Sequence, residues 1–191
     1  LVLTAYERVL VGTNDSRWRM EHAQVIHPDD MARFGQCSII PSVQPTHATS
    51  DMYWAGQRLG RGRIRRAYAY TDLKRQLGML PLGTDFPVED IDPRNTFLAA
   101  VARQDKNRQP AEGYHLDQGL TPREALLGMT LWAAMASRAE DAVGSIEPGK
   151  RADLTVVDRD WLNLQDAHEV LSSTVLATYI NGELLHPQPA N

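Results

Sequence analysis

Short apolar runs alternate with polar segments along the first two fifths of the chain, and their lengths determine which elements they predict. Four runs predict strands, at residues 18–23, 38–43, 66–70 and 79–83. Helical spacing predicts helices that end near residue 10 and cover 27–34, 51–59 and 71–77. This alternation is typical of parallel strands joined by right-handed crossovers. It fits part of a (β/α)8 barrel and a doubly wound open sheet equally well.

Two helices are expected in the middle of the chain. One runs from Pro93 to about residue 103, and the other covers 121–138, where Thr121-Pro122-Arg123-Glu124 is a strong helix start. The pattern changes in the last quarter of the chain. Residues 154–157 and 174–180 are then rich in β-branched side chains, and Asn181-Gly182 predicts a tight hairpin. The sequence therefore predicts an α/β unit over residues 1–140 and a β-rich unit over 141–191.

Composition and charge limit the classes of protein to which this chain can belong. Of 191 residues, 42% are hydrophobic and 23% charged, which is a globular composition, and the formal net charge is -4. One basic cluster stands in this acidic chain, made of Arg58, Arg61, Arg63, Arg65 and Arg66. We interpret it as a solvated face and expect no nucleic-acid partner.

The cysteine count and the apolar runs exclude two further classes. Cys37 is the only cysteine, so neither an internal disulfide nor a thiolate metal cluster can form. The longest apolar stretch, 126–136, is about half of what a membrane span requires, so no membrane association is expected. No secretory signal is visible, but the chain starts at Leu1 rather than methionine. The compartment is thus undetermined, with the cytoplasm favoured.

Three side chains are candidates for chemistry because each follows an apolar or β-like segment: His22, His47 and Asp85. In a barrel, residues at the carboxyl ends of the strands converge on one face. Two imidazoles and a carboxylate suit zinc or a similar divalent ion, which makes water more acidic, and a carboxylate can accept the proton. A hydrogen-bonded structural role for each histidine, and a turn-capping role for Asp85, are the alternatives.

Several segments then resemble one family. The residues that carry the resemblance are 19–24, with Glu21-His22; 42–52, with Gln44-Pro45-Thr46-His47; 82–89, with Gly83-Thr84-Asp85; 120–126; and 144–154, with Glu147-Pro148-Gly149-Lys150. In this order they resemble the amidohydrolase superfamily, in the branch of YtcJ-like metal-dependent hydrolases. The family usually has serine where this chain has Thr84, a mild departure that keeps the hydroxyl.

The resemblance implies the C-terminal half of a TIM-like (β/α)8 barrel, over residues 1–140, and part of an accessory β-sandwich, over 141–191. It implies that His22, His47 and Asp85 bind one or two divalent ions, with zinc favoured, and that Asp85 is also the general base. The family's His-x-His motif after strand one and its bridging Lys or Glu of strand four have no match here. The metal site is therefore expected to be incomplete, and the chain inactive alone.

The function expected from the resemblance is hydrolysis of carbon–nitrogen bonds other than peptide bonds in a small molecule. Met52 and Trp54, which follow His47, are candidate substrate contacts, and Tyr53 between them is a further candidate for a pocket wall; packing in the core is the alternative for each. Two alternatives remain open: a scaffold that kept the fold and lost the metal, and an independent small α/β binding domain. Strands left at an edge tend to pair with another copy, so a homo-oligomer is also expected.

Overall fold

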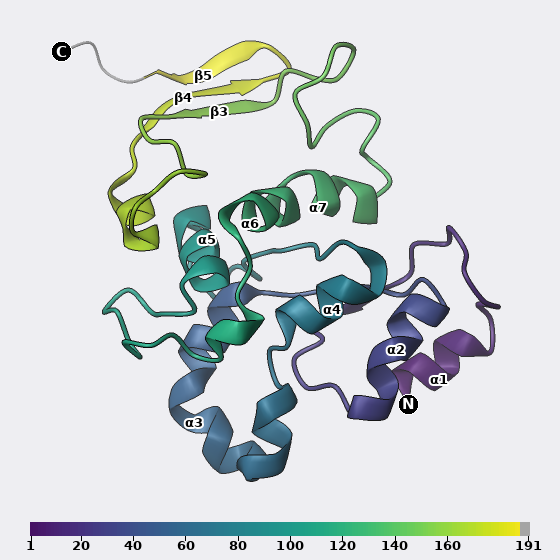
Figure 1. Ribbon diagram of the computed structural model, residues 1–191. Helices are drawn as coiled ribbons and strands as arrows, with labels where there is room; N and C mark the ends of the chain where they lie inside the picture. The colour runs from purple at the N-terminus through teal and green to yellow at the C-terminus, as the bar shows by residue number, and fades with distance from the viewer. Residues whose placement is uncertain (188–191) are drawn as a thin grey trace.

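The computed structural model describes residues 1–187, and it contains helices and two small sheets (Figure 1). The α-helices are α1 (Val2–Glu7), α2 (Pro28–Gln36), α3 (Pro45–Arg63), α4 (Tyr70–Leu77), α5 (Pro93–Val101), α6 (Pro122–Met129) and α7 (Leu131–Ala136). The strands are β1 (Arg19–Glu21), β2 (Ile40–Ser42), β3 (Leu154–Val157), β4 (Val175–Ile180) and β5 (Glu183–Pro187). Short 3₁₀ helices are η1 (Ile64–Arg66), η2 (Leu116–Gln118) and η3 (Ala167–Ser172).

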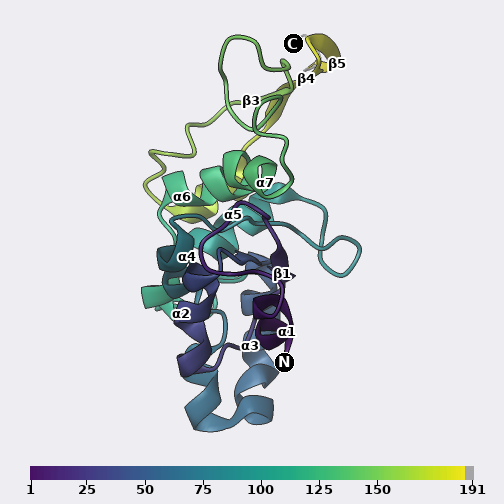
Figure 2. The same cartoon turned by 90° about the vertical axis from the view of Figure 1, so that its right-hand side faces the viewer.

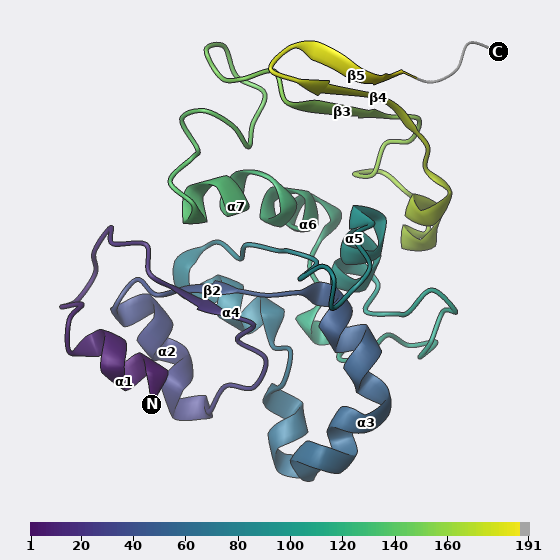
Figure 3. The ribbon, with the colours of Figure 1, turned by 180° about the vertical axis from the view of Figure 1, so that it is seen from behind.

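Parallel pairing places three segments side by side. β1 pairs with β2 in parallel, with Arg19 opposite Ile40, and α2 forms the crossover between them (Figure 3). Just beyond β2, Val43 forms a parallel bridge with Leu82. The first two strands were predicted and are confirmed, although each is only three residues long. Since all three segments run the same way, the residues that follow them lie at one edge.

Two predicted strands are corrected by the structure. Residues 66–70 contain the end of η1, a single antiparallel bridge from Ala67 to Val25 and the start of α4. No strand forms there because Tyr68 has a left-handed backbone (φ 55°), which ends an extended segment. Residues 79–83 form the one bridge at Leu82 and no strand. Pro81 lacks an N–H and cannot donate to a ladder.

Two helices differ from the prediction in their bounds. α3 begins at Pro45, six residues before the expected start, because proline suits the first position of a helix. The helix expected over 121–138 is two helices, α6 and α7, which meet at Thr130, whose backbone is not helical (φ −127°, ψ −92°). Its predicted start is confirmed, since Thr121 and Glu124 form a reciprocal capping box.

The C-terminal sheet confirms the prediction of a β-layer. β3, β4 and β5 form an antiparallel three-stranded sheet, and Ile180 faces Glu183 across the hairpin. Asn181 and Gly182 both have positive φ, as the two-residue turn requires. The sheet stands at one end of the molecule, beyond α6 and α7 (Figure 2). The boundary near residue 140 stays a prediction, and the unit 141–191 ends beyond the described residues.

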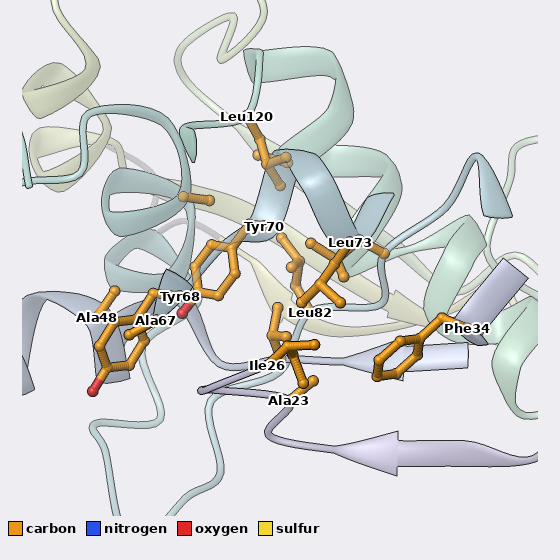
Figure 4. Packing of buried hydrophobic residues seen from close by; sticks show 14 of the residues in the cluster. Ala23, Ile26, Phe34, Ala48, Ala67, Tyr68, Tyr70, Leu73, Leu82 and Leu120 are labelled. Carbon is orange, nitrogen blue, oxygen red and sulfur yellow. The ribbon is translucent and has the colours of Figure 1, made fainter. Parts of the chain in front are cut away.

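The core lies between the parallel segments and the helices. Phe34 of α2, Leu73 of α4 and Leu80 are fully buried, and they belong to one cluster with Ile39 and Val43 of the β2 segment. Figure 4 shows Phe34 and Leu73 in this cluster. The cluster therefore fixes the segments that carry the candidate residues. Among residues 1–187, no helix combines the length and the hydrophobicity needed to cross a bilayer.

Close packing at Gly128 of α6 leads to a stability prediction. A Cβ added there would lie 2.5 Å from Leu82 Cγ and 2.8 Å from the Leu80 carbonyl oxygen. Gly128→Ala is therefore expected to lower the free energy of unfolding by about 1–3 kcal/mol. The control is Gly56→Ala in the exposed part of α3, where a Cβ meets no atom within 4 Å.

Because alanine is the better helix former, Gly56→Ala should stabilise by roughly 0.5–1 kcal/mol. Urea denaturation of both variants measures the difference. Equal stability of the two variants would show that α6 does not pack on the Leu80–Leu82 segment as described.

Candidate metal centre

The three side chains singled out in the sequence come together at the edge where the parallel segments end. His22 directly follows β1, His47 lies in the first turn of α3 just after β2, and Asp85 follows the bridge at Leu82. One possible ligand atom from each lies within 4.8 Å of the other two. The structure thus brings together residues that are 25 and 38 positions apart, while their role as ligands stays a prediction.

Asp85 lies nearest the middle of this cluster. Its Oδ2 is 3.7 Å from His47 Nε2 and 4.0 Å from His22 Nδ1. The two imidazole rings are stacked, with centroids 5.8 Å apart. His47 is buried, whereas half of the His22 side chain and 36% of the Asp85 side chain are exposed. The cluster therefore has a closed side at His47 and an open side at His22 and Asp85.

Two of the three residues have an unusual backbone. His22 (φ 69°) and Asp85 (φ 59°) are in the left-handed region, which few non-glycine residues adopt and in which His and Asp are enriched. Such conformations cost about 1–3 kcal/mol each and occur often at functional sites. The fold therefore holds both side chains at this edge against a local energetic preference.

The donor set fits a divalent cation. His47 Nε2 faces Asp85 and is a buried polar atom without a hydrogen-bond partner in the described part of the chain. Leaving such an atom unpaired costs about 1–3 kcal/mol. Two imidazole nitrogens and a carboxylate oxygen are ligands that zinc accepts. A cation bound between them would satisfy this nitrogen, so the residues present fit the group that the sequence implied.

Two glutamines hold the histidine rings, and sequence reasoning missed both. Gln44 Oε1 lies 2.9 Å from His22 Nδ1, and Gln24 Nε2 lies 3.3 Å from His47 Nδ1. Each glutamine comes from the segment that carries the other histidine, so the contacts cross between the two parallel segments. Their positions, two residues after His22 and three before His47, were the only signal in the sequence.

A cavity of about 240 Å³ lies along α3, starting at Thr46, and none of the three candidate ligands lines it. Its walls are one face of α3, the loop after Asp85, α5 and the loop that follows α5. The residues that line it are Thr46, Thr49, Ser50, Tyr53, Glu89, Asp90, Asn95, Leu98, Gln104, Asp105 and Lys106. Polar contacts join these walls: Ser50 Oγ donates to Glu89 Oε1 (2.7 Å), Tyr53 Oη to Asp105 Oδ2 (2.5 Å) and Lys106 Nζ to Asp90 Oδ2 (3.2 Å).

The wall of this cavity also contains unpaired polar atoms. Thr46 Oγ1 and both amide atoms of Asn95 are buried without a hydrogen-bond partner in the described residues. Met52 and Trp54, the candidate substrate contacts, do not line the cavity, and Trp54 is half exposed. Their contact with substrate stays a prediction. Tyr53 lies between them in the sequence and does line the cavity.

The fold and the clustered His, His and Asp side chains define a mixed α/β protein with a candidate metal centre, and the comparisons with known proteins agree. The family model Amidohydro_3, the amidohydrolase family, matches residues 1–186. The chain therefore belongs to the amidohydrolase family. The expected resemblance to YtcJ-like proteins is confirmed, since the putative amidohydrolase YtcJ of Bacillus subtilis is 29% identical over 95% of this chain and 35% of that protein.

Two other curated relatives share similar identity. Protein LONG AFTER FAR-RED 3 of Arabidopsis thaliana is 34% identical over 98% of this chain and 32% of its own length. The N-substituted formamide deformylase of Arthrobacter pascens is 31% identical over 96% of this chain and 34% of its own length. The chain thus spans about one third of the length of the curated relatives it matches.

Among solved structures, an uncharacterised metal-dependent hydrolase from Pyrococcus horikoshii matches with a TM-score of 0.73 and 32% identity. The match covers 87% of this chain and 33% of that one. An atrazine chlorohydrolase from Arthrobacter aurescens, solved with zinc, matches with a TM-score of 0.58 and 18% identity over 91% of this chain and 38% of that one. At that identity the likeness shows the fold alone.

Proposed function

We propose that this chain supplies His22, His47 and Asp85 to the metal centre of a hydrolase that cleaves carbon–nitrogen bonds, other than peptide bonds, in small molecules. The convergence of these three side chains from three separate segments is the observation that carries the proposal. The relatives support it by name: one is an N-substituted formamide deformylase, and a solved structure of similar fold is a metal-dependent hydrolase.

The two histidines and Asp85 would hold the cation, for which zinc is the favoured choice. When bound, zinc supplies Lewis acidity, which polarises a carbonyl group and lowers the pKa of water. Asp85 would act as the general base: its Oδ2 accepts a proton from the attacking water and passes it to the leaving nitrogen. The partial exposure of Asp85 lets water and substrate reach this oxygen, while buried His47 holds the opposite side closed.

The cavity along α3 offers space for part of a small substrate. Its volume of about 240 Å³ is below the range of roughly 300–1,000 Å³ that holds a whole drug-sized ligand. Its lining includes the charged side chains of Glu89, Asp90, Asp105 and Lys106. The unpaired Thr46 hydroxyl and Asn95 amide lie buried behind this lining.

We propose that the remaining ligands come from the part of the family fold that this chain does not span. In that proposal the chain forms the C-terminal half of a TIM-like barrel with part of a β-sandwich, its metal site is incomplete, and the chain alone does not hydrolyse substrate efficiently. A scaffold that has lost metal binding is the rival proposal, and metal binding separates the two.

Cobalt titration of the 191-residue chain tests the proposal, because Co²⁺ takes the place of zinc and absorbs visible light according to its ligands. We expect weak but saturable binding. His22→Gln, His47→Gln and Asp85→Asn should each weaken binding by more than the roughly 10–100-fold typical for loss of a supporting residue. The control is His186→Gln, on an exposed histidine of β5. Equal binding by all four variants would refute the assignment and favour the scaffold.

A further inference from the structure

A chain of polar contacts leads from the core to His47. The Tyr68 hydroxyl donates to Asp51 Oδ2 at 2.6 Å. Gln24 Nε2 donates to the same oxygen at 3.3 Å and lies 3.3 Å from His47 Nδ1. Burial, followed by the hydrogen bond to Asp51, raises the pKa of the Tyr68 hydroxyl. Tyr68 is therefore a donor throughout the physiological pH range, and Asp51 accepts from two sides.

The backbone anchors Tyr68 firmly. Its N–H donates to the Gln24 carbonyl oxygen at 2.7 Å, next to the Val25–Ala67 bridge. Its own carbonyl accepts from Nη2 of Arg103 at 3.2 Å, and Arg103 is fully buried. Figure 4 shows the Tyr68 ring at the border of the core, with its hydroxyl turned away from Leu73 and Phe34. The start of the contact chain is thus fixed by backbone hydrogen bonds on two sides.

The other two members are placed by their elements. Asp51 lies one helical turn after His47 on α3, so both side chains lie on the same helix face. Gln24 comes from the segment after β1 and reaches both of them. Because an ionised carboxylate only accepts hydrogen bonds, Asp51 holds the amide nitrogen of Gln24 toward itself.

We infer that Gln24, Asp51 and Tyr68 are positioning residues for His47, which fix its ring so that Nε2 faces Asp85. The inference rests on the proposed metal centre. The contact with Gln24 engages Nδ1 and leaves Nε2 as the nitrogen on the side of Asp85, 3.7 Å from its Oδ2. Since Asp51 holds the amide nitrogen of Gln24, this nitrogen donates to Nδ1, which carries no hydrogen in this arrangement. Partners on the second ring nitrogen orient metal-binding histidines and affect metal affinity.

The test uses single substitutions of the three positioning residues in the 191-residue chain, with Co²⁺ as the probe of metal binding. Gln24→Leu is expected to weaken cobalt binding about 10–100-fold. Tyr68→Phe and Asp51→Asn should each weaken it less than Gln24→Leu does, since they act through Gln24. Tyr114→Phe is the matched control. Tyr114 lies next to Tyr68, with ring centroids 6.0 Å apart, and its hydroxyl is buried without a hydrogen-bond partner in the described structure.

A double-mutant cycle separates positioning from general destabilisation. If Tyr68 acts through Gln24, Tyr68→Phe should cause no further loss of cobalt affinity in the Gln24→Leu background. An equal loss in both backgrounds, or a loss no larger than that of Tyr114→Phe, would overturn the inference. Circular dichroism checks that each variant is folded.

A second readout needs no metal. The imidazole nitrogen signals of His47 in NMR spectra, assigned with His47→Gln, should move in Tyr68→Phe and Asp51→Asn and stay in place in Tyr114→Phe. Unchanged His47 signals in both variants would overturn the inference. If the wild-type chain failed to bind cobalt while these signals moved, the metal centre would be wrong and the contact chain to His47 would still hold.

Discussion

On the proposed function, replacement of Asp85 by asparagine is expected to lower kcat/KM for hydrolysis of a carbon–nitrogen bond by about 10²–10⁴-fold in a protein that carries the whole family fold. This is the range that general acid–base catalysis contributes, and it corresponds to about 2.7–5.5 kcal/mol of transition-state stabilisation. Asparagine keeps the shape of the side chain but cannot accept the proton of the attacking water. Steady-state rates over a panel of amides, with metal content measured alongside, give the comparison.

The control for this substitution is Asp141→Asn. Asp141 is an exposed aspartate that belongs neither to the metal centre nor to the lining of the cavity. Its loss should leave kcat within about tenfold of the wild type, because substitutions of exposed residues away from a site have small effects. An Asp85→Asn enzyme that kept more than a tenth of wild-type kcat/KM would exclude Asp85 as the general base.

The convergence of His22, His47 and Asp85 was predictable because each follows a β-like segment. Parallel segments end at the same edge, whatever their exact length, so strands of three residues and even a single bridge at Leu82 suffice. The prediction of strands at 66–70 and 79–83 was wrong, yet the placement of Asp85 did not depend on a full strand. The placement of Asp85 depended on its position after a parallel segment and not on whether that segment forms a full strand.

Side-chain contacts between distant segments were beyond the reach of sequence patterns. Gln24 and Gln44 are polar residues in loops, and only the parallel register of β1 and β2 brings each one to the histidine of the other segment. Arg103 shows the same limit. It was expected at a helix end, but it is fully buried, where its Nε and Nη2 donate to the carbonyl oxygens of Tyr114 and Tyr68.

The C-terminal sheet was predicted with most detail because its signals are local. The β-branched runs and Asn181-Gly182 determine strand and turn without reference to distant residues. In contrast, large apolar side chains of this sheet remain exposed, including Leu184 and Leu185. The local sequence pattern does not indicate what covers these two side chains.

Replacement of Phe34 by alanine is expected to lower the free energy of unfolding by about 3–5 kcal/mol. Phe34 is fully buried in the core cluster, and its carbonyl accepts from the Ile39 N–H at 2.9 Å, in the turn that leads from α2 to β2 (Figure 4). Removing the ring leaves a cavity directly beneath this turn. Urea denaturation followed by circular dichroism measures the effect.

Phe86→Ala is the matched control, because Phe86 is 59% exposed and its loss should change stability by no more than about 0.5 kcal/mol. A cost below about 1 kcal/mol for Phe34→Ala would mean that α2 does not pack on the parallel segments as described. The expected loss is a large fraction of the roughly 5–15 kcal/mol that holds a typical domain folded. Since β2 leads directly into the turn that carries His47, cobalt binding should weaken in Phe34→Ala under conditions in which Phe86→Ala still binds.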